Sequence, residues 1–158
     1  MDSEAEVGRT IWFKVELVNI KRDVRCEMVA PLETKLAFYE KVRVVCRELV
    51  SFSEYSNAEN LYSRCAQTLR SIPKTKLEEL TEEENLSRNT ALTTLFTNLA
   101  YCLIKKDQFA KAIRATQNAI ESDSSNFKAY LRQGQAFKEM NEFEKSTESF
   151  KKAISLNP

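Results

Sequence analysis

Residues 127–158 read FKAYLRQGQAFKEMNEFEKSTESFKKAISLNP, and their pattern of side-chain sizes repeats that of residues 93–126. With a shift of 34 residues, large side chains align with large ones and small with small: Phe96 with Tyr130, Ala100 with Gly134, Phe109 with Phe143, Lys111 with Lys145, Ala119 with Ala153 and Ile120 with Ile154. A repeated pair of helices needs this arrangement, because small residues let two helices cross closely and aromatic residues fill the space between successive pairs. The pattern therefore predicts a series of helix–turn–helix units.

Apolar residues three and four positions apart predict that the chain after Pro31 is helical. The predicted helices span residues 35–50, 55–72, 88–106, 109–122, 126–140 and 142–156. The apolar positions of the first two are Leu36, Val42, Val45, Cys46, Leu49, Ala58, Leu61, Tyr62, Cys65 and Leu69. Pro73 ends the second helix, and caps or turns are expected at Asp107, Ser124 and Asn141.

Residues 10–20 have a different pattern, in which apolar and polar side chains alternate. This period of two, with β-branched and aromatic residues, is typical of a β-strand. A lone strand has two unpaired edges. We therefore expect residues 10–20 to be the last strand of a preceding β domain, and the chain to be a fragment of a longer protein. A less favoured alternative is that the strand pairs with a second copy and gives a strand-mediated homodimer.

These patterns divide the chain into two parts. Residues 1–32 are expected to form an N-terminal tail, the strand and a connector, and residues 33–158 an all-α domain of three helix pairs. The pairs are expected at about residues 39–72, 93–126 and 127–158. Residues 73–92 include the acidic stretch LEELTEEE. We interpret them as an insertion, because their like charges disfavour tight packing, and one alternative is that this insertion extends the flanking helices.

The composition disfavours an enzyme, because the 158 residues include only 2 glycines and no histidine. Phosphate-binding loops, dinucleotide-binding turns and nucleophile elbows need several glycines close together. Histidine is the usual general base near neutral pH and a common zinc ligand. We therefore expect no catalytic residue, no metal site and no cofactor. The glutamates of the acidic stretch are interpreted as a solvated face: Glu78, Glu79, Glu82, Glu83 and Glu84.

Charge and hydropathy argue against two classes of partner. The 24 Lys and Arg residues balance 23 Asp and Glu residues, giving a formal net charge of +1, whereas sequence-independent nucleic-acid binding needs a strongly basic surface. No apolar run approaches the roughly 18 residues of a membrane span. The cysteines form no CxxC pair and are interpreted as buried thiols of a reducing, cytoplasmic compartment: Cys26, Cys46, Cys65 and Cys102.

The 34-residue unit resembles the tetratricopeptide repeat, whose pattern is W-x2-L-G-x2-Y, then A-x3-F, then P. The last unit contains Tyr130-x2-Gln133-Gly134-x2-Phe137, then Ser146-x3-Phe150, then Pro158. The earlier units contain Phe96-x2-Leu99-Ala100-x2-Leu103 with Ala112-x3-Thr116, and Val42-x2-Val45-Cys46-x2-Leu49 with Ala58-x3-Tyr62. The resemblance implies an all-α superhelix of three tetratricopeptide repeats. An unrelated helical bundle would not explain these size matches, and a related RNA-binding repeat needs a basic surface that this net charge does not offer.

The chain is also similar to the FKBP-type immunophilin co-chaperones. The similarity covers about residues 10–158 and is carried by WFKVELVNI at residues 12–20, FTNLAYCLIK at residues 96–105 and NEFE at residues 141–144. In that family the strand closes a peptidyl-prolyl isomerase domain. Almost all of that domain is missing here, so the resemblance implies no isomerase activity in this chain. The family's repeats bind the C-terminal EEVD tail of heat-shock protein 90 and, in some members, that of heat-shock protein 70.

Two basic pairs have the spacing of four residues that places side chains on one face of a helix: Arg43 with Arg47, and Lys128 with Arg132. Such pairs are usually solvated surface, so the spacing alone is weak evidence. The resemblance implies that the residues of the family's carboxylate clamp correspond to Arg43, Arg47, Asn98, Lys128 and Arg132. At the position of Arg43 the family has Lys, and at that of Arg47 it has Asn or a small polar residue. At the other three positions it has the residues found here, Asn, Lys and Arg. These donors suit the two carboxylates of a C-terminal Asp.

The leading hypothesis is a chaperone-docking module that captures the acidic C-terminal peptide of heat-shock protein 90. Arg47 departs from the short polar side chain usual at its position, so it either strengthens capture or blocks the pocket. The alternative is a scaffold that holds another partner in its concave groove with a non-functional clamp, and salt dependence separates the two. Aromatic residues at the repeat positions are interpreted as packing: Phe96, Tyr101, Phe137 and Phe150.

Overall fold

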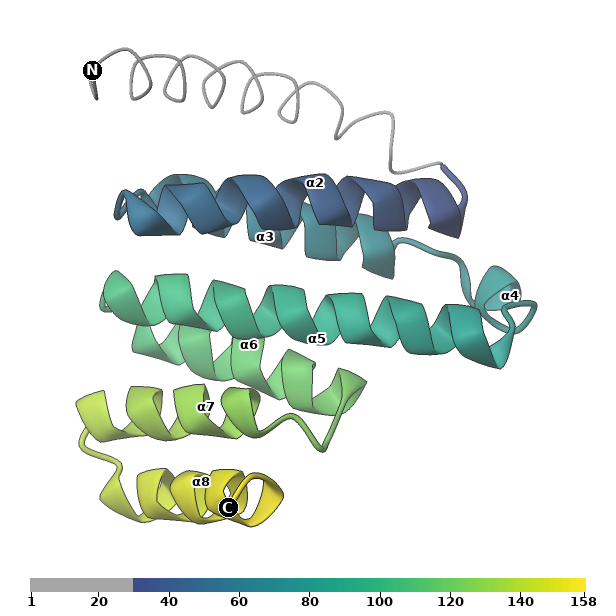
Figure 1. Ribbon diagram of the computed structural model, residues 1–158. Helices are drawn as coiled ribbons and strands as arrows, with labels where there is room; N and C mark the ends of the chain where they lie inside the picture. Colours follow the sequence, from purple (N-terminus) through teal and green to yellow (C-terminus); the bar gives the residue numbers. More distant parts are fainter. Residues whose placement is uncertain (1–29) are drawn as a thin grey trace, which may run out of the picture.

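The structure is a computed structural model that describes residues 30–158, and the regular elements in this range are all helices (Figure 1). They are α2 (Leu32–Ser51), α3 (Tyr55–Arg70), α4 (Lys74–Leu77), α5 (Glu82–Lys105), α6 (Phe109–Ser122), α7 (Phe127–Glu139) and α8 (Phe143–Leu156). The predicted all-α class is thus confirmed. The strand expected at residues 10–20 lies outside the described residues, as does Cys26.

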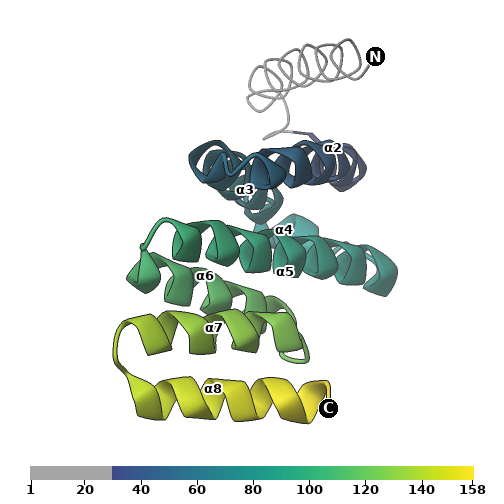
Figure 2. The ribbon, with the colours of Figure 1, turned by 60° about the vertical axis from the view of Figure 1, so that its left-hand side comes forward.

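The helices form three pairs, α2 with α3, α5 with α6 and α7 with α8, which stack in chain order (Figure 2). The first helices of successive pairs also contact one another, because α5 packs against both α2 and α7. They therefore share one face of the stack. A solenoid built this way presents its first helices as a continuous surface to a partner. None of the described helices has the length and apolar character needed to cross a bilayer.

The two helices of each pair are joined by a tight turn that contains one residue with positive φ. These residues are Ser53, Asp107 and Asn141, with φ of 60°, 56° and 60°. Asp and Asn tolerate this left-handed conformation better than most residues, and the turns expected at Asp107 and Asn141 are confirmed. Ser124 lies in the turn between α6 and α7. The side chain that caps α7 is that of Asn126, which accepts a hydrogen bond from the Ala129 amide at 3.0 Å.

Close helix crossings occur at the small residues that the repeat aligned. Ala100, Ala112 and Ala119 are fully buried. Gly134 lies against the Phe150 ring, and a Cβ added to this glycine would come within 2.7 Å of Phe150 Cδ1 and Cε1. Real Cβ contacts are not that short, so with any other residue here α7 and α8 would have to separate or the Phe150 ring would have to move.

The acidic stretch is partly helical and extends the long central helix, which was one of the alternatives for this insertion, so the predicted start of that helix is corrected. The sequence suggested a start near residue 88, but α5 begins at Glu82. Thr81 and Glu84 form a capping box: the Glu84 amide donates to Thr81 Oγ1 at 3.2 Å, and the Thr81 amide donates to Glu84 Oε2 at 2.8 Å. Acidic residues in a first turn also interact favourably with the helix dipole. The same glutamates that disfavour packing thus favour the start of a helix.

Three of the four cysteines lie in the core. Cys46, Cys65 and Cys102 are buried free thiols, as the sequence predicted. Burial raises the pKa of Cys65 and Cys102 to about 12, and it raises that of Cys46 as well. At neutral pH these thiols are protonated and pack as small apolar side chains.

Candidate functional site

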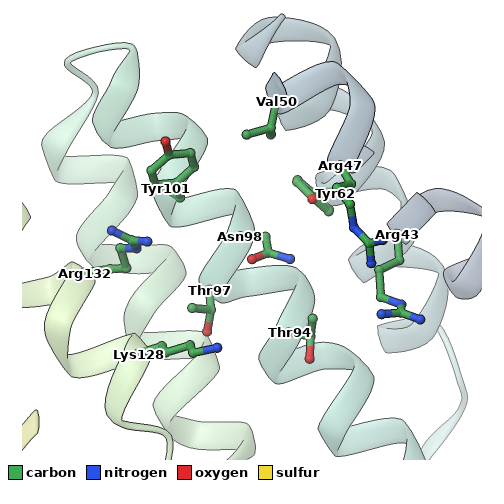
Figure 3. A pocket seen from close by; sticks show the side chains of 10 residues that line it. All are labelled: Arg43, Arg47, Val50, Tyr62, Thr94, Thr97, Asn98, Tyr101, Lys128 and Arg132. Atoms are coloured by element: carbon green, nitrogen blue, oxygen red, sulfur yellow. The ribbon is translucent and has the colours of Figure 1, made fainter. Parts of the chain in front are cut away.

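Four helices contribute side chains to a cavity of about 520 Å³ on the face formed by the first helices (Figure 3). We call it the basic cavity. Its lining residues are Arg43, Arg47 and Val50 of α2, Tyr62 of α3, Thr94, Thr97, Asn98 and Tyr101 of α5, and Lys128 and Arg132 of α7. The structure therefore brings together all five of the site residues that the sequence suggested.

The helices place these residues through their regular spacing. Arg43 and Arg47 are one turn apart on α2, and Lys128 and Arg132 are one turn apart on α7. Asn98 lies on α5, which packs between those two helices. The two basic pairs thus approach the cavity from opposite sides, with the Asn98 amide between them (Figure 3).

The lining carries four cationic side chains and no carboxylate. The overall net charge of +1 hides this local excess, because acidic residues elsewhere balance it. Such a cavity favours an anionic ligand, since its entry relieves the repulsion among the cations and supplies acceptors for their N–H groups.

Arg43 is the one lining cation that forms an ion pair among the described residues. Its Nε and Nη2 donate to Glu40 Oε2 at 2.9 and 2.7 Å, one turn away on the same helix. The two side chains are 41% and 55% exposed. An exposed pair of this kind contributes little to stability. Arg43 can therefore exchange Glu40 for a ligand carboxylate at small cost.

Arg132 is held in place more firmly. Its guanidinium lies 4.7 Å from the centroid of the Tyr101 ring, and Nη1 donates to Gln135 Oε1 at 2.9 Å. Burial lowers the pKa of Arg132, and the neighbouring Tyr101 hydroxyl acts in the opposite direction. A guanidinium remains charged in proteins despite such a shift. Its stacking and hydrogen bond orient it before any ligand arrives.

Arg47 and Lys128 have no ion pair or hydrogen bond with any residue in the described part of the chain. The Lys128 ammonium lies 5.8 Å from the Phe127 ring centroid, and both cations are exposed. Their donors are consequently available to an incoming ligand. Arg47 extends beside Arg43 from α2 (Figure 3), and its side chain lines the cavity of about 520 Å³.

The neutral polar residues of the cavity come mainly from α5. Thr94, Thr97, Asn98 and Tyr101 follow the i, i+3, i+4, i+7 spacing of one helix face. Asn98 interacts with the Tyr62 hydroxyl, which offsets part of the rise that burial causes in the pKa of Tyr62. Asn98 thereby links the cavity wall to α3.

Sequence reasoning missed several lining residues, and three of the four aromatic residues interpreted as packing, Tyr101, Phe137 and Phe150, line cavities. Tyr101 was interpreted as packing, yet its half-buried ring forms part of the cavity wall beneath Arg132. Phe96, from the same group, is buried in the core as expected. The signal for Tyr101 was its position three residues after Asn98, since residues at this spacing share a helix face.

A second cavity of about 760 Å³ adjoins the basic cavity, because Tyr101 and Arg132 line both. Its wall includes the apolar side chains of Ile104, Phe109 and Phe150. The wall of this second cavity also carries charges of both signs, from Lys105, Asp107, Arg132, Lys138 and Glu139, so it differs from the basic cavity in having carboxylates. No group of three His, Cys, Asp or Glu side chains within residues 30–158 could hold a metal ion.

Comparison with known proteins identifies the last of the three helix pairs. Residues 127–158 match the family described as tetratricopeptide repeat. Similar proteins include "Peptidyl-prolyl cis-trans isomerase FKBP4" of Homo sapiens, 39% identical over 39% of this chain and 13% of that protein. "Outer envelope protein 61" of Arabidopsis thaliana is 28% identical over 70% of this chain and 18% of that protein. The matched segments thus span less than a fifth of these relatives.

Among solved structures, one titled "Crystal structure of MamA" aligns with 94% of this chain and 91% of its own, at 16% identity and a TM-score of 0.41. A second, titled "MamA RS-1 ArsTM double mutant", gives 16% identity and a TM-score of 0.39. The stacked helix pairs and the repeat match of residues 127–158 describe this part of the chain as an all-α tetratricopeptide-type superhelix, a protein-interaction scaffold.

Proposed function

We propose that this module binds the acidic C-terminal peptide of heat-shock protein 90, and of heat-shock protein 70 where the same tail is present, through a carboxylate clamp. The observation that carries the proposal is the basic cavity itself: Arg43, Arg47, Asn98, Lys128 and Arg132 line one cavity that has no acidic residue in its wall. A peptide that ends in Asp presents two carboxylates at one point, and these donors match them.

Similarity to FKBP4 supports the link to immunophilins, because that relative is named a peptidyl-prolyl cis-trans isomerase. In the proposed arrangement the superhelix joins a chaperone to an isomerase-like domain that precedes it. The proposed compartment is the cytoplasm, where the buried thiols Cys46, Cys65 and Cys102 stay reduced.

In this proposal Arg47 strengthens the clamp. It has no ion-pair or hydrogen-bond partner among residues 30–158, and the cavity remains open beside it. A forked cation at this position adds donors for a carboxylate. An EEVD tail carries two glutamates upstream of its terminal Asp, so an additional cation has an acidic side chain to meet.

The test is calorimetric titration of the chain with the peptide Glu-Glu-Val-Asp. Each charge-assisted contact is worth about 1.5–3 kcal/mol, so the Lys128→Ala/Arg132→Ala variant should bind at least about tenfold more weakly. A C-terminally amidated peptide should also bind more weakly. The matched control is Lys111→Ala/Arg114→Ala, which removes the same charge from exposed positions of α6 outside the cavity, and which should leave the affinity unchanged.

The result that contradicts the proposal is a folded wild-type chain that does not bind the peptide, or equal loss in both double variants. A second candidate function then takes its place, in which the apolar side chains of the second cavity, Ile104, Phe109 and Phe150, hold a segment of another partner. Salt separates the two candidates. Carboxylate capture should weaken steeply between low and high ionic strength, because salt screens charges beyond roughly 10 Å at 0.1 M, whereas apolar binding should not.

A further inference from the structure

Thr97 has a buried hydroxyl with no hydrogen-bond partner, and Thr97 Oγ1 is the one such side-chain atom within residues 30–158. The residue is 7% exposed and lines the basic cavity from α5. Leaving a buried hydroxyl unpaired is unfavourable, because the group has lost water and gained nothing in exchange. Such a group in a cavity wall indicates a partner that is absent from the free protein.

Neighbouring threonines show that Thr97 has an alternative that it does not use. Thr93 Oγ1 donates to the Asn89 carbonyl at 2.8 Å, and Thr94 Oγ1 donates to the Thr90 carbonyl at 2.9 Å. Threonine in a helix commonly forms this bond to the carbonyl four residues earlier. Thr97 forms no such bond to Thr93. The Thr97 hydroxyl instead faces the part of the cavity wall that Lys128 of α7 forms (Figure 3).

The surroundings of the hydroxyl define the kind of group that it can meet. Arg43, Arg47, Lys128 and Arg132 make the cavity a site for anions. In such a site a neutral O–H serves as a donor, and a carboxylate oxygen is the acceptor that the cations also attract. Lys128 has no hydrogen bond or ion pair within the described part of the chain, so it can move aside when a carboxylate enters.

We propose that Thr97 is a ligand-binding residue whose hydroxyl donates a hydrogen bond to the same peptide carboxylate that Lys128 binds. The inference rests on the proposed function, because it names a further donor of that site. In this proposal the unpaired hydroxyl of Thr97 destabilises the free protein, and its hydrogen bond to the peptide stabilises the complex. A residue with only a structural role would not produce both effects.

The experiment compares Thr97→Val with the wild-type chain in two measurements. Valine has nearly the shape of threonine and lacks the hydroxyl, so the thermal midpoint of the free variant should rise by about 2–4 °C once the unpaired group is gone. Its affinity for the Glu-Glu-Val-Asp peptide, measured by calorimetry, should fall about tenfold, as expected for a lost bond to a carboxylate. Thr97→Ser restores the hydroxyl and should restore the affinity to within about threefold.

Thr93→Val is the matched control, because Thr93 lies on the same helix outside the cavity lining and its buried hydroxyl already bonds to the Asn89 carbonyl. It should neither raise the thermal midpoint nor weaken binding by more than about twofold. A double-mutant cycle of Thr97→Val with Lys128→Met tests the shared carboxylate. If both donors bind one group, the combined loss should be smaller than the product of the two single losses.

Two failures are distinguishable. If the wild-type chain does not bind the peptide, the proposed function fails and the role of Thr97 fails with it. If the wild-type chain binds but Thr97→Val binds equally well, only the role of Thr97 is overturned. Strict additivity in the double-mutant cycle would overturn the assignment to the carboxylate that Lys128 binds.

Discussion

The guanidinium of Arg132 lies 4.7 Å from the ring centroid of Tyr101, and this contact joins α7 to α5 at the boundary of the two cavities. A guanidinium over an aromatic ring gains about 0.5–2 kcal/mol, more when it is partly desolvated. Arg132 is half-buried, so the ring limits its motion as well as attracting it. Tyr101 is therefore a positioning residue for Arg132.

Replacing Tyr101 with Leu should weaken binding of the Glu-Glu-Val-Asp peptide by about three- to tenfold, because Arg132 loses the surface that orients it. Tyr101→Phe keeps the ring and should retain the affinity to within about twofold. Calorimetric titration of both variants measures the difference. Equal affinities for the Leu and Phe variants would show that the ring has no part in orienting Arg132.

Replacing Arg47 with Ala tests whether this cation contributes to the clamp. Arg47 is exposed and unpaired among residues 30–158, so its loss should leave the thermal midpoint unchanged. The affinity for the acidic peptide should fall several-fold and should depend less steeply on salt, because one cation fewer faces the ligand. Tighter binding by the Ala variant would instead show that Arg47 obstructs the cavity.

Much of the fold follows from the sequence, because repeated helix pairs are determined by local periodicity. The 34-residue period aligned Ala100 with Gly134, and the structure places both at close packing positions. The start of α5 was predicted too late, since the acidic composition outweighed a capping-box signature that was present at Thr81 and Glu84. A threonine followed three residues later by glutamate is a local signal that could have corrected it.

The site could be predicted only in part, because its residues come from helices far apart in the chain. The five suggested residues came from resemblance to a family and from spacing on each helix. How α2, α5 and α7 pack decides what else faces the cavity, and this packing placed Thr97 and Tyr101 in its wall. Side-chain spacing on one helix could have suggested Tyr101. Whether the Thr97 hydroxyl has a hydrogen-bond partner depends on its three-dimensional surroundings, and a sequence pattern does not show these.

Replacing Gly134 with Ala should destabilise the superhelix although alanine favours helices. The added Cβ would lie 2.7 Å from Phe150 Cδ1 and Cε1, so α7 and α8 must separate or the ring must move. Overpacking of this kind costs about 1–3 kcal/mol, which exceeds the gain of about 1 kcal/mol in helix propensity. Denaturant unfolding measures the change. Gly134→Ala/Phe150→Leu should recover part of the loss, and an unchanged midpoint for Gly134→Ala would show that the ring moves aside freely.

The buried thiols predict how stability depends on alkaline pH. Burial raises the pKa of Cys65 and Cys102 from 9.0 to about 12 in the folded chain. The folded state therefore favours the protonated thiol, and this contribution is fully present below pH 9 and is lost as the pH rises from 9 towards 12. In a Cys26→Ser background, the free energy of unfolding should fall over that range. A variant with Cys65→Ala and Cys102→Ala should show a smaller fall, measured by urea unfolding at each pH.

The same buried thiols, Cys65 and Cys102, should resist alkylation at pH 8 until the chain unfolds. Rapid labelling of the native Cys26→Ser chain would show that the core opens locally around these residues.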